Sequence, residues 1–223
     1  MMVVAVPVKD LVNAKQRLTA LLDPGERSLL ARAMLHDVLG ALRRSALVEP
    51  WVISGDADVV AIAQAHGVRV LREDANRGHT AAVRFAQHEA QRASAEVFLT
   101  VPGDVPCVTV DEIDRLATEA RRAPRTAVFT ASRSGLGTNG VALCPVDAMP
   151  LTFGEPSFPN HVALARARGL FVSVLSLPGL ALDVDTLDDL RALLAETADT
   201  QSRRLVLSWR LGDRARGAAL SCS

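Results

Sequence analysis

The sequence predicts an α/β fold, a single domain whose mostly parallel mixed sheet has helices on both faces. From the N-terminus to about Arg122, apolar segments rich in β-branched residues alternate with segments of helical periodicity. Such alternation is typical of parallel strands joined by right-handed crossovers. A chain of 223 residues, 49% of them hydrophobic, can bury a full core in one domain. We expect this domain over residues 1–198, followed by a polar, basic and partly disordered tail over residues 199–223.

The strands are predicted from short apolar runs that end in loops. The first run, MVVAVPV over residues 2–8, is apolar throughout and therefore indicates a strand buried on both faces. The fourth run ends in Pro102-Gly103-Asp104, a sequence that favours a turn directly after a strand. After the first, the expected strands are residues 48–54, 68–71, 97–101 (the fourth run), 126–131, 140–143 and 170–177.

The helices are predicted from capping residues and from the spacing of apolar residues. Asp23 as the N-cap, Pro24 at the first helical position and Glu26 three residues after the cap begin a helix that should run to about Arg44. Its inner face is expected to consist of Leu29, Leu30, Ala33, Met34, Val38 and Leu42. Further helices are expected over residues 56–66, 80–92 and 109–122, within 153–169, and over 185–195, where Asp185 and Thr186 supply the cap.

Charge and hydropathy exclude several classes of function. The net charge is zero, whereas a protein that binds nucleic acid normally has a basic excess. No run of about 18 apolar residues is present, so no transmembrane helix is expected. The N-terminal segment is too short and wrongly flanked for a signal peptide, and we expect a cytoplasmic protein.

The loop after the first strand contains three basic residues, Lys9, Lys15 and Arg17. Only two of the 25 basic residues are lysines, and both lie in this loop. Lysine provides a compact point charge where arginine provides a planar fork. Cations at the carboxyl end of a strand suit a polyphosphate, although neither a Walker A nor a dinucleotide-binding glycine motif is present. A solvated charged loop is the alternative.

Three aspartates are candidates for a metal site. Asp104 follows the fourth strand, and Asp183 and Asp185 are separated by one residue, so they share a side of an extended segment. Carboxylates gathered near one point repel each other unless a cation lies between them, and oxygen ligands suit Mg²⁺. Alternatively, Asp104 serves as a turn residue and Asp185 as a helix cap.

A third group of residues has the character of an anion site. Glycines in the segment Gly135-Leu136-Gly137-Thr138-Asn139-Gly140 and in Phe153-Gly154-Glu155-Pro156-Ser157 allow backbone N–H groups to approach a ligand closely. Ser157 stands at a helix start, a position that favours a carboxylate or phosphate. Ordinary turns with an N-cap serine explain the same residues.

Five motifs in this order resemble the 2-phospho-L-lactate guanylyltransferase family of coenzyme F-420 biosynthesis. They are P-V-K-x₄-A-K-x-R-L, G-D-x-P, G-x-G-T-N, F-G-x-x-S-F and L-D-V-D-T, between Val3 and about Leu194. The resemblance implies a GT-A-like, Rossmann-like nucleotidyltransferase fold. It also implies transfer of GMP from GTP to a three-carbon phosphoacid, namely 2-phospholactate, 3-phosphoglycerate or phosphoenolpyruvate, with release of pyrophosphate. A downstream enzyme that consumes the unstable product, and a second copy of the chain, are further candidate partners.

The resemblance also implies roles for the candidate residues. The catalytic triphosphate loop contains Lys9, Lys15 and Arg17. The Mg²⁺ ligands are Asp104, Asp183 and Asp185. The acceptor is bound by Thr138, Gly154 and Ser157. After Gly78 the sequence departs from the family, which usually has Leu-Asn where this chain has His79-Thr80. Gly78 and His79 should lie near the base and acceptor pockets, and we hypothesise that His79 meets the extra hydroxyl of 3-phosphoglycerate.

Other functions are compatible with the same residues. A related scaffold could transfer GMP to a pterin cofactor or CMP to a sugar phosphate, and Asp183-Val184-Asp185 has the D-x-D pattern of a glycosyltransferase. A glycosyltransferase releases a nucleoside diphosphate, whereas the proposed transferase releases pyrophosphate. A non-catalytic nucleotide-binding protein is disfavoured because the lysines and the three aspartates are all present.

Overall fold

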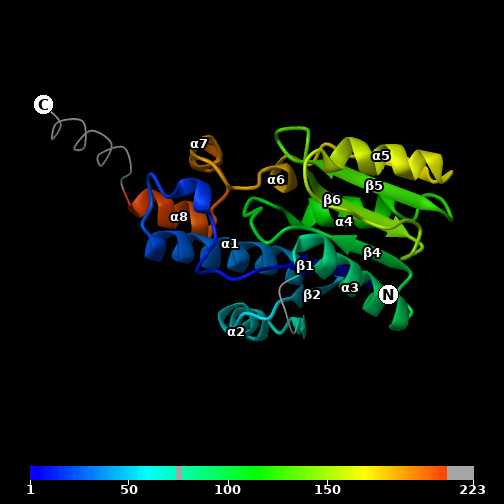
Figure 1. The fold of residues 1–223 in the computed structure, drawn as a ribbon, viewed down its shortest axis with the longest axis horizontal. Helices are drawn as coiled ribbons and strands as arrows, with labels where there is room; N and C mark the ends of the chain where they lie inside the picture. The colour runs from blue at the N-terminus through cyan, green and yellow to red at the C-terminus, as the bar shows by residue number, and fades with distance from the viewer. Residues whose placement is uncertain (74–76, 210–223) are drawn as a thin grey trace, which may run out of the picture.

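A computed structural model describes residues 1–73 and 77–209. Its strands form one seven-stranded sheet. The strands are β1 (Met2–Pro7), β2 (Glu49–Ile53), β3 (Arg69–Leu71), β4 (Val97–Thr100), β5 (Thr126–Ala131), β6 (Thr138–Cys144) and β7 (Phe171–Val174). Their order across the sheet is β3-β2-β1-β4-β6-β5-β7 (Figure 1). Strand β6 runs antiparallel to β4 and β5, and the remaining pairs are parallel. The predicted mostly parallel mixed sheet is confirmed.

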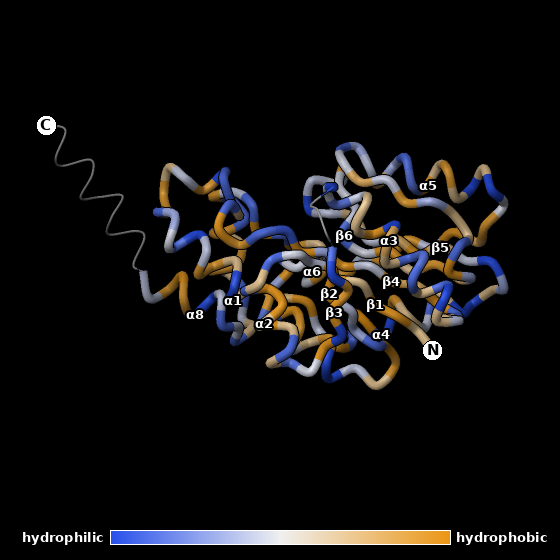
Figure 2. The backbone as a smooth tube through the Cα atoms, turned by 60° about the horizontal axis from the view of Figure 1, so that its bottom comes forward, coloured by the Kyte–Doolittle hydropathy of each residue, from blue (hydrophilic) through white to orange (hydrophobic). Residues whose placement is uncertain are grey.

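Helices cover both faces of this sheet. The helices are α1 (Pro24–Arg44), α2 (Ala57–Ala65), α3 (His79–Arg92), α4 (Val110–Glu119), α5 (Ser157–Ala167), α6 (Pro178–Ala181), α7 (Leu187–Ala195) and α8 (Gln201–Ser208), with a 3-10 turn η1 (Gln16–Leu18). Alternate residues of β1 face opposite sides, so Val4 packs with α1, α2 and α4 while Val3 packs with α3 and α5. Figure 2 shows this apolar interior as orange tube along the strands. Among the helices described, none has the length and apolar character to cross a membrane.

Helix α1 begins as its caps predict. The Asp23 carboxylate accepts from Glu26 N at 2.8 Å, and the Glu26 carboxylate accepts from Asp23 N at 3.1 Å. The prediction that Leu29 lies on the inner face is wrong, because its side chain is 51% exposed. The first turns of α1 pack instead through Leu30 and Met34 in a third cluster with residues of α7 and α8. Leu29 therefore faces solvent.

Helix α8 lies within the segment expected to form the tail. The carboxylate of Asp37, on α1, accepts from Gln201 N at 2.7 Å and Ser202 N at 2.9 Å. An acidic side chain at a helix N-terminus satisfies free N–H groups and favours the helix dipole. Val206 is buried in the same cluster as the first turns of α1. The remaining part of the segment, residues 210–223, lies outside the described residues.

Candidate active site

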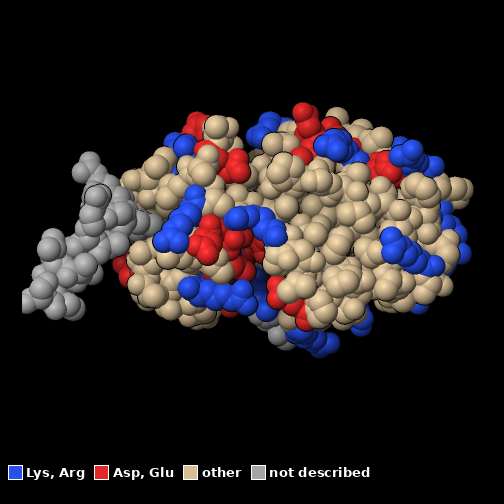
Figure 3. All heavy atoms as spheres, turned by 90° about the horizontal axis from the view of Figure 1, so that it is seen from above, with Lys and Arg blue, Asp and Glu red and all other residues tan. Residues whose placement is uncertain are grey.

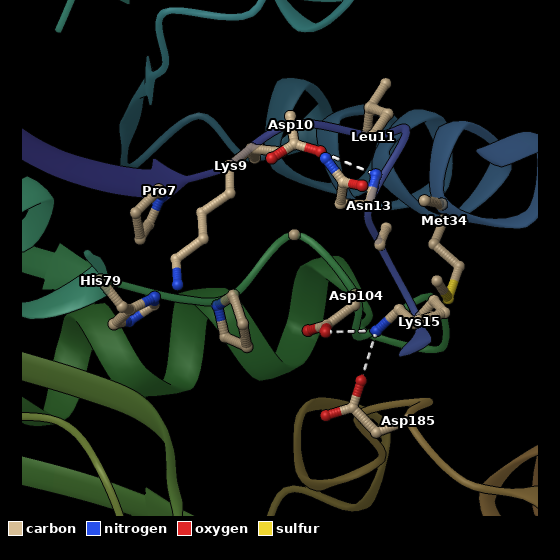
Figure 4. A pocket seen from close by; sticks show the side chains of 15 residues that line it. Pro7, Lys9, Asp10, Leu11, Asn13, Lys15, Met34, His79, Asp104 and Asp185 are labelled. Carbon is tan, nitrogen blue, oxygen red and sulfur yellow. Dashed lines mark hydrogen bonds and ion pairs between the residues drawn. The ribbon is translucent and has the colours of Figure 1, made fainter. Parts of the chain in front are cut away.

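Loops from distant parts of the chain meet at the carboxyl ends of β1 and β4, where ligands bind in open α/β sheets. The ammonium of Lys15 donates to Asp104 Oδ2 at 2.5 Å and to Asp185 Oδ1 at 2.8 Å (Figure 4). Lys15 has φ 56° and ψ 42°, a left-handed conformation that is rare for a residue with a side chain. Lys15, Asp104 and Asp185 are therefore brought together as a compact ionic cluster.

The ionic cluster is partly withdrawn from solvent. The Lys15 side chain is only 5% exposed. Burial acts to lower the pKa of Lys15, but the carboxylates of Asp104 and Asp185 raise it above its usual value, so the ammonium stays charged. Burial acts to raise the pKa of Asp185, and the positive charges of Lys15 and Arg17 bring it below its usual value. Lys15 thus helps to keep the Asp185 carboxylate in its ionised form.

Asp183 is held by a buried amide. Asn139 Nδ2 donates to Asp183 Oδ1 at 3.0 Å, and the same nitrogen contacts the carbonyl oxygens of Leu180 and Ala181 at 3.2 and 3.1 Å. Burial, and then the negative charges of Asp104 and Asp185, raise the pKa of Asp183 even though the amide acts against this shift. The three aspartates are close enough to repel one another. Asn139 lies within the G-x-G-T-N motif, but its contact with Asp183 follows from no local sequence pattern.

The three carboxylates suit Mg²⁺ by their chemistry, but their oxygens do not all meet at one point in this structure. Hard oxygen ligands and mutual repulsion favour a small divalent cation, and the Lys15 ammonium demonstrates that a cation is accommodated between Asp104 and Asp185. In the part of the chain that the structure describes, no three His, Cys, Asp or Glu side chains are arranged to hold a metal ion. Asp104, Asp183 and Asp185 are the residues that would hold it. The Mg²⁺ site remains a prediction.

The Asp185 carboxylate is not used to cap α7, because the neighbouring Thr186 is the N-cap. Thr186 is the N-cap, and its hydroxyl accepts from Asp189 N at 3.3 Å while the Asp189 carboxylate accepts from Thr186 N at 2.9 Å. The sequence prediction assigned the cap to Asp185 and Thr186 together. The structure assigns it to Thr186 and leaves the Asp185 carboxylate on Lys15.

A first pocket of about 410 Å³ opens beside the ionic cluster. Its apolar wall consists of Pro7, Leu11, Ala14, Ala31, Met34 and Pro102. Lys9 is exposed, and its amino group points across the pocket toward His79 (Figure 4). His79 packs edge-on against Phe153 with the ring centroids 4.6 Å apart, and burial lowers the pKa of His79 to about 4. Gly78 precedes it with φ 90°, a conformation that favours glycine.

A second pocket of about 570 Å³ shares Asp185 with the first. Its lining is polar and includes Arg17, Ser132, Arg133, Ser134, Asp183 and Asp189. Arg17 is exposed and lies at this pocket, while Lys9 and Lys15 line the first. Figure 3 shows acidic side chains gathered in a hollow with basic side chains on either side. The aspartates thus stand at the junction of two pockets.

A buried polar cluster lies where β6 and α5 begin. Thr138 Oγ1 is 3.0 Å from Ser157 Oγ and 3.0 Å from His161 Nδ1. Helix α5 has no side-chain cap, and Gly154 in the preceding loop has φ 118°. Burial lowers the pKa of His161 to about 4, so the imidazole is neutral at neutral pH. Thr138, Gly154 and Ser157 were predicted as site residues, and they line neither pocket, although their chain neighbours Gly137 and Glu155 line the second. His161 carries no sequence signal beyond a lone histidine on an apolar helix.

The match to a family model covers nearly the whole chain. The model described as "Guanylyl transferase CofC like" matches residues 2–216. A phosphoenolpyruvate guanylyltransferase from Conexibacter woesei is 39% identical over 188 residues, which are 84% of each chain. A 2-phospho-L-lactate guanylyltransferase from Methanothermobacter thermautotrophicus is 38% identical over 198 residues, 89% of this chain and 86% of the relative.

Solved structures of low sequence identity share the fold. A protein from Desulfovibrio desulfuricans, assigned by name to the nucleotide-diphospho-sugar transferases, has a TM-score of 0.76 at 17% identity and covers 93% of this chain and 94% of its own. A nucleotidyl transferase from Methanothermobacter thermautotrophicus has a TM-score of 0.62 at 17% identity, covering 86% of this chain and 95% of its own. The predicted nucleotidyltransferase fold is confirmed, and the chain belongs to the CofC-like guanylyl transferase family.

Proposed function

We propose that this guanylyltransferase moves GMP from GTP to the phosphate of a three-carbon phosphoacid in coenzyme F-420 biosynthesis. The observation that carries the proposal is the ionic cluster of Lys15, Asp104 and Asp185 at the junction of two pockets. Two substrates that react with each other require adjoining sites with the charge-neutralising groups between them. The names of relatives at 38–39% identity, phosphoenolpyruvate and 2-phospho-L-lactate guanylyltransferase, support this class of acceptor.

The two pockets differ in a way that assigns one substrate to each. The apolar wall of the first pocket suits a base and ribose, and Lys9 and Lys15 suit the phosphates that follow. Arg17 and Arg133 in the second pocket suit a compact anion, since arginine binds carboxylate or phosphate with a planar fork. We place GTP in the first pocket and the phosphoacid in the second.

The reaction is an in-line substitution at the α-phosphorus of GTP. An oxygen of the acceptor phosphate forms the new bond to this phosphorus, and the bond to the bridging oxygen of pyrophosphate breaks. A phosphate oxygen is already ionised at neutral pH, so no general base is needed. Lys9 and Lys15 neutralise the donor phosphates and steady the departing pyrophosphate, Arg17 neutralises the acceptor phosphate, and Ser157 and Thr138 orient the acceptor. Mg²⁺ held by Asp104, Asp183 and Asp185 would supply further neutralisation of phosphate charge.

The identity of the acceptor can be tested at His79. His79 lines the first pocket, and its neutral imidazole can meet the hydroxyl that 3-phosphoglycerate has and 2-phospholactate lacks where the acceptor extends past the aspartates toward GTP. We expect His79→Ala to lower the rate with 3-phosphoglycerate relative to 2-phospholactate. An unchanged ratio of kcat/KM for the two acids would remove His79 from acceptor selection.

The deciding experiment measures pyrophosphate release with GTP and Mg²⁺. Phosphoenolpyruvate, 2-phospho-L-lactate and 3-phospho-D-glycerate are supplied in parallel, with ATP and CTP as donor controls. We expect turnover with GTP and with one acid above the others. Binding of GTP without turnover of any acid would favour a pterin or sugar-phosphate acceptor. The cytoplasmic location, a homodimer and a downstream enzyme that consumes the product stay predictions.

A further inference from the structure

The hydrogen bonds around His161 have a defined direction. Thr152 N donates to His161 Nε2 at 3.1 Å, and a backbone N–H can only donate. His161 Nε2 therefore carries no proton, and in the neutral imidazole the proton is on Nδ1. Nδ1 lies 3.0 Å from Thr138 Oγ1, so the imidazole donates to Thr138.

The same direction continues to the start of α5. Because Thr138 Oγ1 accepts from His161, its own hydroxyl proton is available for Ser157 Oγ at 3.0 Å. Ser157 then accepts from Thr138 and has its hydroxyl proton left to donate. Among the contacts of the described residues, the hydroxyl of Ser157 has no acceptor other than Thr138, and only 2% of the residue is exposed. A buried donor without an acceptor is costly unless a ligand supplies one.

We propose that His161 is a positioning residue that orients the Thr138–Ser157 pair so that the Ser157 hydroxyl is left to donate to the anionic acceptor. With the reverse tautomer, Thr138 would donate to His161 and Ser157 would donate to Thr138. Ser157 would then present only an oxygen lone pair to an incoming carboxylate or phosphate. The inference rests on the proposed function, in that Ser157 and Thr138 bind the acceptor. It adds the residue that sets the polarity of this pair, which none of the relatives' names indicates.

The surroundings of His161 hold its ring in one orientation. The ring stacks on Phe129 with an interplanar angle of 7° and a centroid distance of 5.9 Å, and Phe153 meets it edge-on at 5.2 Å. Only 2% of the residue is exposed. Fixed packing matters because a ring turned by 180° about its Cβ–Cγ bond would place carbon atoms where Nδ1 and Nε2 now stand, and both hydrogen bonds would be lost.

The first test reads the tautomer directly and needs no turnover. Nitrogen-15 NMR of the ligand-free full chain at pH 7.5 assigns the protonated ring nitrogen of His161, with His161→Gln used to identify its signals. We expect a neutral ring with the proton on Nδ1. A proton on Nε2 would overturn the inference, whatever acceptor the enzyme uses.

The second test compares variants that keep or remove the donor at the Nδ1 position. His161→Asn places an amide N–H near that position, whereas His161→Phe keeps the ring packing without any donor. We expect KM for the acceptor to rise about tenfold in His161→Phe, with the KM for GTP unchanged, and to rise less than about threefold in His161→Asn. If His161→Phe does not fold, His161→Gln replaces it as the variant without a donor at Nδ1. His88→Gln, on an exposed histidine of α3, is the matched control and should leave both KM values unchanged.

The outcomes separate this inference from the proposed function. Equal changes in both KM values, or an Asn variant as weak as the Phe variant, would overturn the positioning role even if the enzyme uses a phosphoacid. Failure of the wild-type protein to turn over any of the three acids would instead overturn the proposed acceptor. The NMR result would then decide alone whether the pair is polarised as a donor.

Discussion

The two sides of the candidate active site solve the binding of anions differently. On the nucleotide side, full charges from three separate loops meet in the Lys15, Asp104 and Asp185 cluster. On the side proposed for the acceptor, the hydroxyls of Thr138 and Ser157 stand at the beginnings of β6 and α5 and contact the buried, neutral His161. Charges on loops can change partners as a phosphate arrives or leaves, whereas neutral donors on regular elements hold a fixed geometry. We therefore propose that the first side neutralises charge and that the second side selects the acceptor.

Removing a carboxylate at the junction should damage both sides at once and give the largest effect. We expect Asp183→Ala and Asp104→Ala each to lower kcat/KM by on the order of 10²-fold or more, because each removes part of a preorganised charge arrangement. The measurement is pyrophosphate release at saturating GTP. Asp188→Asn, at a side chain 82% exposed on α7, is the control and should retain activity. Activity near the wild-type level in Asp183→Ala would end the metal assignment.

Lys15 should affect catalysis and cation binding in opposite directions. We expect Lys15→Ala to lower the rate by about 10²-fold, since the charge that faces the phosphates is lost. The same variant should bind Mn²⁺ about tenfold more tightly, because the ammonium no longer competes for Asp104 and Asp185. Electron paramagnetic resonance of free Mn²⁺ measures the affinity. Weaker Mn²⁺ binding in Lys15→Ala would show that Lys15 supports the cation site instead of competing for it.

Acid should destabilise the fold through two buried histidines, because burial lowers the pKa of His79, beside the first pocket, and of His161 to about 4. Burial lowers the pKa of His161 from 6.5 to about 4. Above pH 6.5 the ring is neutral in both the folded and unfolded chain, and its contribution to stability is fully present. Between pH 6.5 and about 4 the unfolded chain takes up the proton first, so the free energy of unfolding falls by on the order of 3 kcal/mol, and below this range the loss levels off.

Urea unfolding between pH 7.5 and 4.5 measures this loss. The decline should be smaller in His161→Phe, which has no group to titrate there, and unchanged in His88→Gln. The pKa of Asp185 lies below its ordinary value of 3.8, so its ionic contribution is lost only at lower pH. An identical decline in wild type and His161→Phe would contradict the assignment to His161.

Two variants, one on each side of the site, test whether the two substrates bind separately. We expect Ser157→Ala to raise KM for the acceptor about tenfold and leave KM for GTP unchanged, because one hydrogen bond to an anion is lost. Lys9→Gln should do the reverse. Initial rates with each substrate varied in turn measure both constants. If either variant changes both constants equally, the two pockets do not bind the substrates separately.

Local signals predicted much of the fold. The capping box of Asp23 and Glu26 forms as the sequence indicates, and the bounds of β5 and of α1 agree with the prediction. The start of β6 at Thr138, two residues before the predicted strand, and its reversed direction could not be inferred, since both depend on pairing with distant strands. Leu29 was misassigned because the first turns of α1 pack against α7 and α8 instead of the sheet.

The candidate site was predictable in composition but not in contacts. Lys15, Asp104 and Asp185 were each chosen from local patterns, yet their contacts join residues 89 and 170 positions apart. The contacts of Asn139 and His161 do not follow from local sequence, because a buried amide or imidazole acquires its role from the partner that the fold brings to it. Shared motifs indicated which residues matter, and packing determined how they act.

The reversal of β6 has a consequence for how this enzyme can diversify. Antiparallel β5 and β6 form a hairpin, so the loop over residues 132–137 crosses the second pocket with both of its ends anchored in neighbouring strands. A hairpin loop can change length and composition while the register of its strands persists. The loops after β1 and β4 have no such freedom, since they join helices that cover the core. The loop over residues 132–137 is therefore the part of the second pocket that can vary in length and composition while the flanking strands stay in register.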